Sequence, residues 1–176
     1  ENYKEMYKSV LDMLKSDLEQ EQLLPRDIMI IDMDTFEYSK NSMRLSNIQS
    51  DYNAVAWDDE FNYDADKEIY KFNIHTAGAA NPEDFFREDS VVYSSVRRAK
   101  GNETYMVYIV NAQKCVNSLQ RRSDRNALFT AVTRSKGWVK VLGYGEDMAI
   151  LQEEFEEIKR QKFKLHFDKY PTKEEQ

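Results

Sequence analysis

The chain has 176 residues, of which 41% are hydrophobic and 12% aromatic, so it can form one packed domain and is too apolar for a disordered chain. Its net charge of −7 argues against a domain that binds nucleic acid by itself, because basic side chains supply most non-specific affinity for phosphates. Its apolar runs are far too short to span a membrane, and it begins at Glu1 without a charged-then-apolar leader. We therefore expect a cytoplasmic domain without a membrane partner, cut from a longer protein.

The first half of the chain predicts a helix, a buried strand and a second helix. Residues 2–22 carry apolar side chains at 3.6-residue spacing, and Asn2 with Glu5 forms a plausible capping box. Residues 27–32 form an apolar run bounded by charges, which predicts a strand covered on both faces. A short helix is expected around residues 43–48, a strand at 54–57, and mostly loop over 58–88, where a surface insertion is favoured over a lid.

The second half alternates strands with helices. Strands are predicted at residues 90–96, 105–110, 138–142 and 163–167, and helices at 123–136 and 146–162, with a polar turn at 97–103. Ser123 is the expected N-cap of the first of these helices, and Met148, Leu151, Phe155 and Ile158 form the expected buried face of the second. This alternation predicts an α/β fold, with a mostly parallel sheet and helices on both of its faces.

Several kinds of active site are not supported by the sequence. There is no glycine-rich loop followed by Lys-Ser/Thr, and no apolar strand ends in an Asp-Glu pair that could hold Mg²⁺. Cys115 is the single cysteine, and His75 and His166 have no ligand-type partner at helical spacing. A complete nucleotide-hydrolysing site, an internal disulfide and a metal site are therefore not expected.

Two basic segments remain as candidates for chemistry. In the first, residues 97–103, Gly101 would allow backbone to approach a ligand and Glu103 could accept hydrogen bonds from a ribose hydroxyl, at the carboxyl ends of the strands where ligands bind in parallel sheets. A simple solvated connection explains this composition as well. In the second, residues 125–136, Arg134 lies at the end of a predicted helix. It could cap the helix dipole or serve as an arginine finger, which neutralises charge on a transferring phosphoryl group.

Taken in order, the two segments resemble motifs V and VI of superfamily 1 helicases of the UvrD/PcrA/Rep type. The matching residues are Val-Arg-Arg-Ala-Lys-Gly-Asn-Glu (96–103) and Arg-Asn-Ala-Leu-Phe-Thr-Ala-Val-Thr-Arg-Ser-Lys (125–136), each followed by an apolar strand. The resemblance is closest over residues 89–145, and the segment 167–172 is similar to the tail of one bacterial branch. It implies that residues 1–176 form a single C-terminal RecA-like domain.

In that family two RecA-like domains face each other across ATP and Mg²⁺, and a single nucleic-acid strand crosses both. The resemblance implies that Arg134 is the catalytic arginine finger, supported by Thr133. It also places Lys100, Gly101 and Glu103 beside the nucleotide. The Mg²⁺ ligands and the P-loop belong to the N-terminal RecA-like domain, which is the implied protein partner.

The implied nucleic-acid partner is a single strand, DNA in preference to RNA, bound through Arg97 and Arg98. Arg97 departs from the family pattern, which often has histidine at this position.

Two functions stay open. The first is the half of an ATP-dependent helicase or translocase that completes the ATP site, so that this fragment alone is inactive. The second is a degenerate helicase domain that serves as a protein-interaction module through its acidic surface. For the motor function we expect the turns at 97–103 and 133–136 to lie at the same edge of the sheet.

Overall fold

The computed structural model describes residues 2–21, 23–56, 72–77, 84–116 and 121–161. The strands are β1 (Ile28–Asp32), β2 (Asn73–Thr76), β3 (Ser90–Ser95), β4 (Thr104–Val110) and β5 (Ser135–Val141). They form one sheet in the order β2-β3-β1-β4-β5, and each pair of neighbours is parallel. The predicted α/β fold with a parallel sheet is therefore confirmed.

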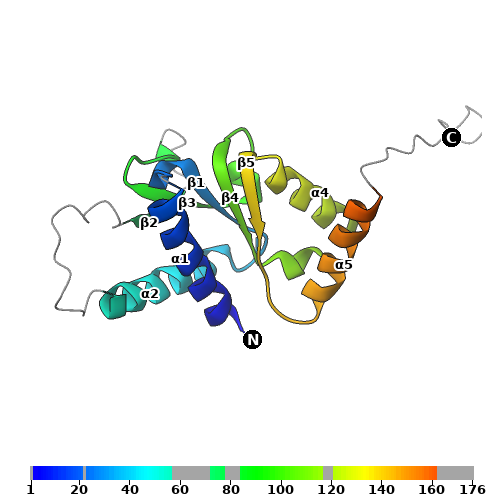
Figure 1. Cartoon of the computed structure of the whole chain (residues 1–176), viewed down its shortest axis with the longest axis horizontal. Coiled ribbons are helices and arrows are strands. Elements are labelled where there is room, and N and C mark those ends of the chain that lie inside the picture. The colour runs from blue at the N-terminus through cyan, green and yellow to red at the C-terminus, as the bar shows by residue number, and fades with distance from the viewer. Residues whose placement is uncertain (1, 22, 57–71, 78–83, 117–120, 162–176) are drawn as a thin grey trace, which may run out of the picture.

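Helices cover both faces of this sheet, as Figure 1 shows. They are α1 (Tyr3–Gln20), α2 (Tyr38–Ala56), α3 (Val96–Ala99), α4 (Arg121–Val132) and α5 (Asp147–Arg160), with short 3-10 turns η1 (Pro25–Asp27) and η4 (Ala112–Cys115). Apolar side chains of α1 and α2 pack against one face, and those of α3, α4 and α5 pack against the other. This is the layered arrangement of a RecA-like α/β domain.

The predicted first helix is confirmed, both in its position in the sequence and in the apolar face that it buries. The Asn2 side chain accepts hydrogen bonds from the backbone N–H groups of Lys4 and Glu5, as expected of an N-cap. Leu11 and Leu14 are fully buried against the sheet. Because burial of one such side chain contributes about 1.5–3 kcal/mol, α1 is held mainly by its apolar face.

A polar contact also joins α1 to β4 and to the edge strand β5. The carboxylate of Asp17, buried in α1, accepts hydrogen bonds from the Tyr108 hydroxyl of β4 and from Lys140 Nζ of β5, the latter at 2.7 and 2.8 Å. Burial raises the pKa of the Tyr108 phenol, and the neighbouring carboxylate raises it further, so this tyrosine stays a hydrogen-bond donor.

Replacing Asp17 by alanine is expected to lower the free energy of unfolding by about 1–3 kcal/mol, because the Tyr108 hydroxyl loses its buried acceptor. Urea denaturation measures the change. Glu19→Ala provides a matched control in the same helix, since Glu19 forms only an exposed pair with Lys15 and should contribute about 0.5 kcal/mol or less. Equal effects of the two substitutions would contradict a special role for Asp17.

Several predicted boundaries are wrong. Residues 54–56 continue α2 instead of forming a strand, and β2 lies within the segment 58–88 that was expected to be loop. Helix α4 begins at Arg121, so Ser123 lies inside it and is not its N-cap, and the helix ends at Val132 before β5 starts. On α5, Leu151 is buried as expected but Ile158 is exposed. The strand predicted at 163–167 lies outside the described residues.

Candidate functional site

The segment that links β3 to β4 runs from the carboxyl edge of the sheet, where the parallel strands end, to its amino edge, where they begin. Helix α3 follows directly after the carboxyl end of β3, and the chain then crosses the α4 face before β4 begins at Thr104. Arg97 and Arg98 therefore lie near the carboxyl edge, whereas Glu103 lies at the amino edge. The expectation that all of residues 97–103 share one edge is wrong, because a connection between parallel strands must return to the amino edge.

Glu103 and Arg134 are brought together at that amino edge. Strands β4 and β5 are parallel neighbours, so the residues that precede them meet, and the Thr104 N–H donates to the Arg134 carbonyl over 3.0 Å. The Arg134 Nη1 atom lies 4.0 Å from Glu103 Oε1. For these two residues, the prediction of a shared edge is confirmed.

The Arg134 side chain is folded back on the end of α4. Its Nε donates to the Thr130 carbonyl over 3.2 Å, and its Nη2 donates to Thr133 Oγ1 over 3.3 Å. The Thr133 hydroxyl itself donates to the Thr130 carbonyl. Only 18% of the Arg134 side chain is exposed, against 50% for Glu103. The guanidinium thus complements the carbonyl end of a helix, as the capping interpretation predicts, and also borders an open carboxylate.

The turn between α3 and β4 exposes its backbone. Lys100 and Gly101 are both exposed, and the Asn102 N–H closes the turn on the Ala99 carbonyl at 3.0 Å. Gly101 has a φ of 92°, which strains any residue with a side chain, while an added Cβ would meet no atom within 4 Å. The glycine is therefore required by backbone conformation, and the space beside it is open to a ligand.

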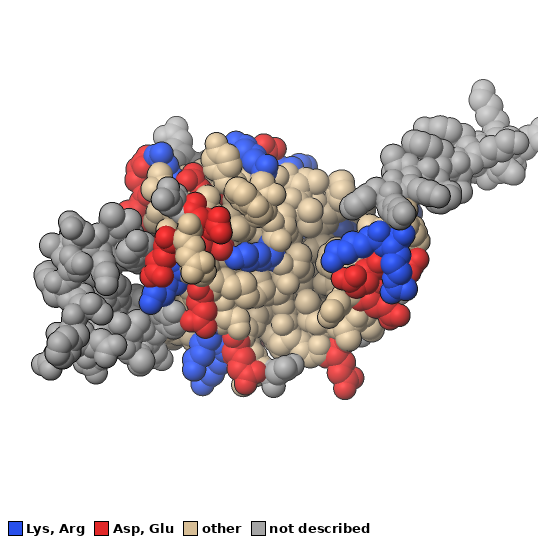
Figure 2. Space-filling model, in the orientation of Figure 1, with Lys and Arg blue, Asp and Glu red and all other residues tan. Residues whose placement is uncertain are grey.

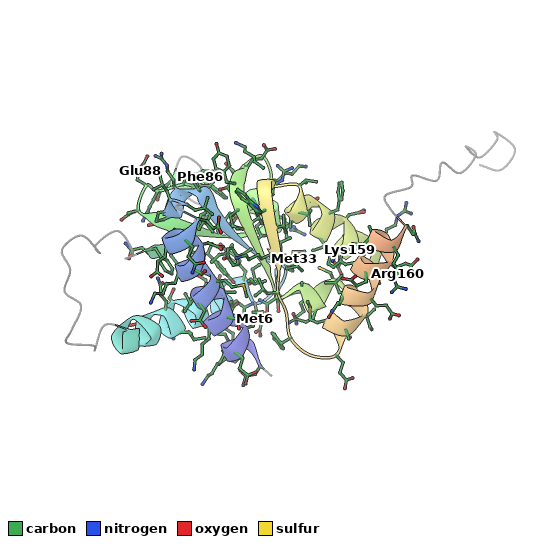
Figure 3. The ribbon with its side chains drawn as sticks, viewed as in Figure 1. Met6, Met33, Phe86, Glu88, Lys159 and Arg160 are labelled. Atoms are coloured by element: carbon green, nitrogen blue, oxygen red, sulfur yellow. The ribbon has the colours of Figure 1, made fainter. Side chains whose placement is uncertain are left out.

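Exposed apolar side chains border the same edge. Leu24, Phe86 and Tyr105 are exposed and lie just before or at the start of β1, β3 and β4, and the exposed Trp138 lies midway along the edge strand β5. Figure 3 labels Phe86 and Glu88 at the upper edge of the view. Lys136 Nζ lies 5.9 Å from the centre of the Tyr105 ring. Such residues cannot be predicted to be functional from the sequence, because an isolated exposed apolar side chain carries no spacing signal.

The two arginines near the carboxyl edge differ in availability. Arg98 donates to the Ala77 carbonyl, and its guanidinium carbon lies 5.5 Å from the centre of the Tyr38 ring. Arg97 is exposed. Because Arg98 makes these contacts and Arg97 is exposed, Arg97 is the freer of the two to contact a phosphate.

Basic and acidic side chains are interspersed on the face seen in Figure 2, and no continuous basic surface is visible there.

The carboxyl ends of β1 and β4 hold a closed polar network. Asp32 is fully buried and accepts hydrogen bonds from Tyr93 Oη at 2.7 Å, Asn111 Nδ2 at 2.8 Å, the Asp34 N–H at 2.9 Å and Asn41 Nδ2 at 3.0 Å. Burial raises the pKa of the Asp32 carboxyl, and these hydrogen bonds oppose that rise. With its lone pairs satisfied, the carboxylate positions the strand ends.

The described residues offer little support for other chemistry. Burial raises the pKa of the Cys115 thiol to about 12, so it is a poor nucleophile. His75 Nε2 lies 2.9 Å from the Asp84 carbonyl, and His166 is outside the described residues. Within the described ranges, no group of three or more His, Cys, Asp or Glu side chains is placed to hold a metal ion, and none of their helices is long and apolar enough to cross a membrane.

Comparison with known proteins gives a family for the region that contains these residues. Residues 90–142 match the family described as UvrD-like helicase C-terminal domain. The matched region runs from the start of β3 to just beyond the end of β5, so it includes both Glu103 and Arg134. The resemblance predicted over residues 89–145 is therefore confirmed. No curated protein matches the chain significantly.

Proposed function

We propose that this domain completes the ATP site of a helicase or translocase, because its residues 90–142 match the family described as UvrD-like helicase C-terminal domain. It would do so opposite an N-terminal RecA-like domain that carries the P-loop. The observation that carries the proposal is the placement of Glu103 and Arg134, 4.0 Å apart at the amino edge of the sheet. A cation at a rigid helix end beside a carboxylate suits a ligand with both phosphate and hydroxyl groups.

Each residue at this edge has a distinct role in the proposed site. Arg134 donates from its planar guanidinium to the γ-phosphate and neutralises charge in the transition state. Glu103 accepts a hydrogen bond from a ribose hydroxyl. Lys100 and Gly101 offer a cation and open backbone beside the nucleotide, and Thr133 orients Arg134 through its 3.3 Å hydrogen bond.

The surroundings of the site suit a domain interface. The exposed Leu24, Phe86 and Tyr105 border the edge that would meet the N-terminal domain, which would cover them. The described carboxylates do not form a group suited to Mg²⁺, so we assign the metal ligands to that partner domain. The metal would neutralise charge on the phosphates of ATP.

We place the nucleic-acid strand at the opposite, carboxyl edge. Arg97 is exposed there and can donate to a phosphate, while Arg98, bonded to the Ala77 carbonyl, supports the end of α3. Because the net charge of the chain is −7, we expect Arg97 to support only weak binding without the partner domain. Single-stranded DNA is the proposed ligand, in preference to RNA.

The purified chain alone is expected to hydrolyse no ATP and to bind single-stranded DNA weakly, with affinity that falls as salt rises. Fluorescence anisotropy with a labelled oligonucleotide measures the binding at several salt concentrations. Arg97→Ala should weaken the binding further, whereas Arg160→Ala, an exposed arginine at the end of α5, should not change it. ATP turnover that persists after removal of contaminating enzymes would overturn the half-site proposal.

A further inference from the structure

Three groups hold the Arg134 side chain, the proposed arginine finger, away from solvent. Two of them, the Thr130 carbonyl and Thr133 Oγ1, belong to the same helix end and accept hydrogen bonds from Arg134. The third is the Glu103 carboxylate, which comes from the start of β4 and lies 4.0 Å from Nη1. Glu103 is thus the only one of the three that is both charged and carried by another element.

We infer that Glu103 is a positioning residue. It holds Arg134 in this folded-back orientation through the ion pair, and the pair breaks when a ribose hydroxyl donates a hydrogen bond to the Glu103 carboxylate. The inference rests on the proposed function. It adds an exchange: the same carboxylate pairs with the finger before nucleotide arrives and with the ribose afterwards. Arg134 then becomes free to turn toward the phosphates.

The geometry implies that breaking the Arg134–Glu103 pair costs little free energy. The Glu103 side chain is half exposed, and a pair of this kind at 4.0 Å changes an equilibrium by no more than about fivefold. The hydrogen bonds to Thr130 and Thr133 keep the guanidinium at the edge of the site while the pair breaks. A ligand with phosphates but no ribose must break the pair without compensation, whereas ATP supplies a hydroxyl in its place.

This difference can be measured with two substrates of the whole helicase that carries this domain. The values of kcat/KM for ATP and for inorganic tripolyphosphate, which lacks the ribose, are determined for the wild type and for Glu103→Gln. We expect Glu103→Gln to raise kcat/KM for tripolyphosphate by about two- to fivefold, because the stored pair is gone. For ATP the same variant should show an unchanged or lower kcat/KM, because the ribose contact is lost as well.

The controls test whether the effect passes through Arg134. In an Arg134→Ala background, Glu103→Gln should no longer raise the activity toward tripolyphosphate. Glu88→Gln, at an exposed glutamate near the same edge, should leave the ratio of the two substrates unchanged. Glu103→Asp keeps the charge but is shorter by one methylene, so it should lose the 4.0 Å pair and raise kcat/KM for tripolyphosphate as Glu103→Gln does.

The outcomes separate this inference from the proposed function. If Glu103→Gln lowers activity toward ATP but leaves tripolyphosphate unchanged, Glu103 contacts only the ribose and the exchange is overturned. An equal fall with both substrates would indicate a merely structural role and would overturn it too. If instead Arg134→Ala hydrolyses ATP normally, the proposed function itself fails.

Discussion

Replacing Arg134 by alanine is expected to lower kcat for ATP hydrolysis by about 10³-fold or more in the whole helicase, with a much smaller change in KM. In the proposed site the guanidinium would stabilise charge that develops only in the transition state, so its loss would affect the chemical step more than binding. Steady-state ATPase assays with saturating single-stranded DNA measure both constants. Arg134→Lys should recover little activity, because an ammonium group cannot reproduce the planar pair of donors.

Arg160→Ala is the matched control for this experiment. Arg160 also ends a helix, forms an exposed ion pair with Glu157, and lies on α5, as Figure 3 shows. It should leave kcat unchanged. Both alanine variants should remain folded, because a cation at a helix end contributes about 1 kcal/mol or less when exposed, as Arg160 is, and up to about 2 kcal/mol when partly buried, as Arg134 is. Normal kcat in Arg134→Ala, with altered binding of a protein partner, would favour the interaction-module alternative instead.

Replacing Asp32 by alanine is expected to lower the free energy of unfolding by about 3 kcal/mol or more, the largest stability effect we predict. The substitution leaves the donors of Tyr93, Asn41 and Asn111 without their buried acceptor, and each unsatisfied donor costs about 1–3 kcal/mol. Asp32→Asn should also destabilise, because its amide group presents a donor to other donors. Chemical denaturation at pH 7 measures both variants, with Glu88→Gln as an exposed control. A loss below about 1 kcal/mol would contradict this role.

The raised pKa of Asp32 also predicts how stability depends on pH. The folded state keeps the carboxyl proton to a higher pH than the unfolded chain, in which the pKa of an aspartate is close to its ordinary value of 3.8. The contribution of this group to stability is therefore fully present below that value and is lost as pH rises through the folded pKa. In Asp32→Asn this loss should be absent, so the wild type should show the steeper fall in melting temperature over that interval.

Much of the fold could be predicted because its strongest patterns are local. Leu11 and Leu14 repeat at helical spacing, and the run at residues 28–32 is apolar on both faces, so α1 and β1 needed no tertiary information. Strand β2 could not be predicted in this way. Its residues are half exposed, and its conformation depends on pairing with β3, in which His75 lies opposite Val92.

The candidate site was predictable in its residues but not in its contacts. The order of the two motifs indicated Glu103 and Arg134, and parallel pairing of β4 with β5 brought them together. The roles of Thr130 and Ala77 were hidden, because both act through backbone carbonyls, which any residue could supply at those positions. The separation of Arg97 from Glu103 depends on the path of the chain across the sheet, which spacing does not encode.

The link between β3 and β4 is short for the height of the sheet that it spans. The four helical residues of α3 advance the chain by about 6 Å, and the four that follow can add about 14 Å when extended. The sheet is about 20 Å high at this point, from Thr104 to Val110, at about 3.3 Å per residue. Val96 and Ala99 anchor this short link in the core, so a displacement of its start at the carboxyl edge can reach the amino edge through only a few residues. In the proposed function, a nucleic-acid strand that displaces Arg97 would act on Glu103 through these residues.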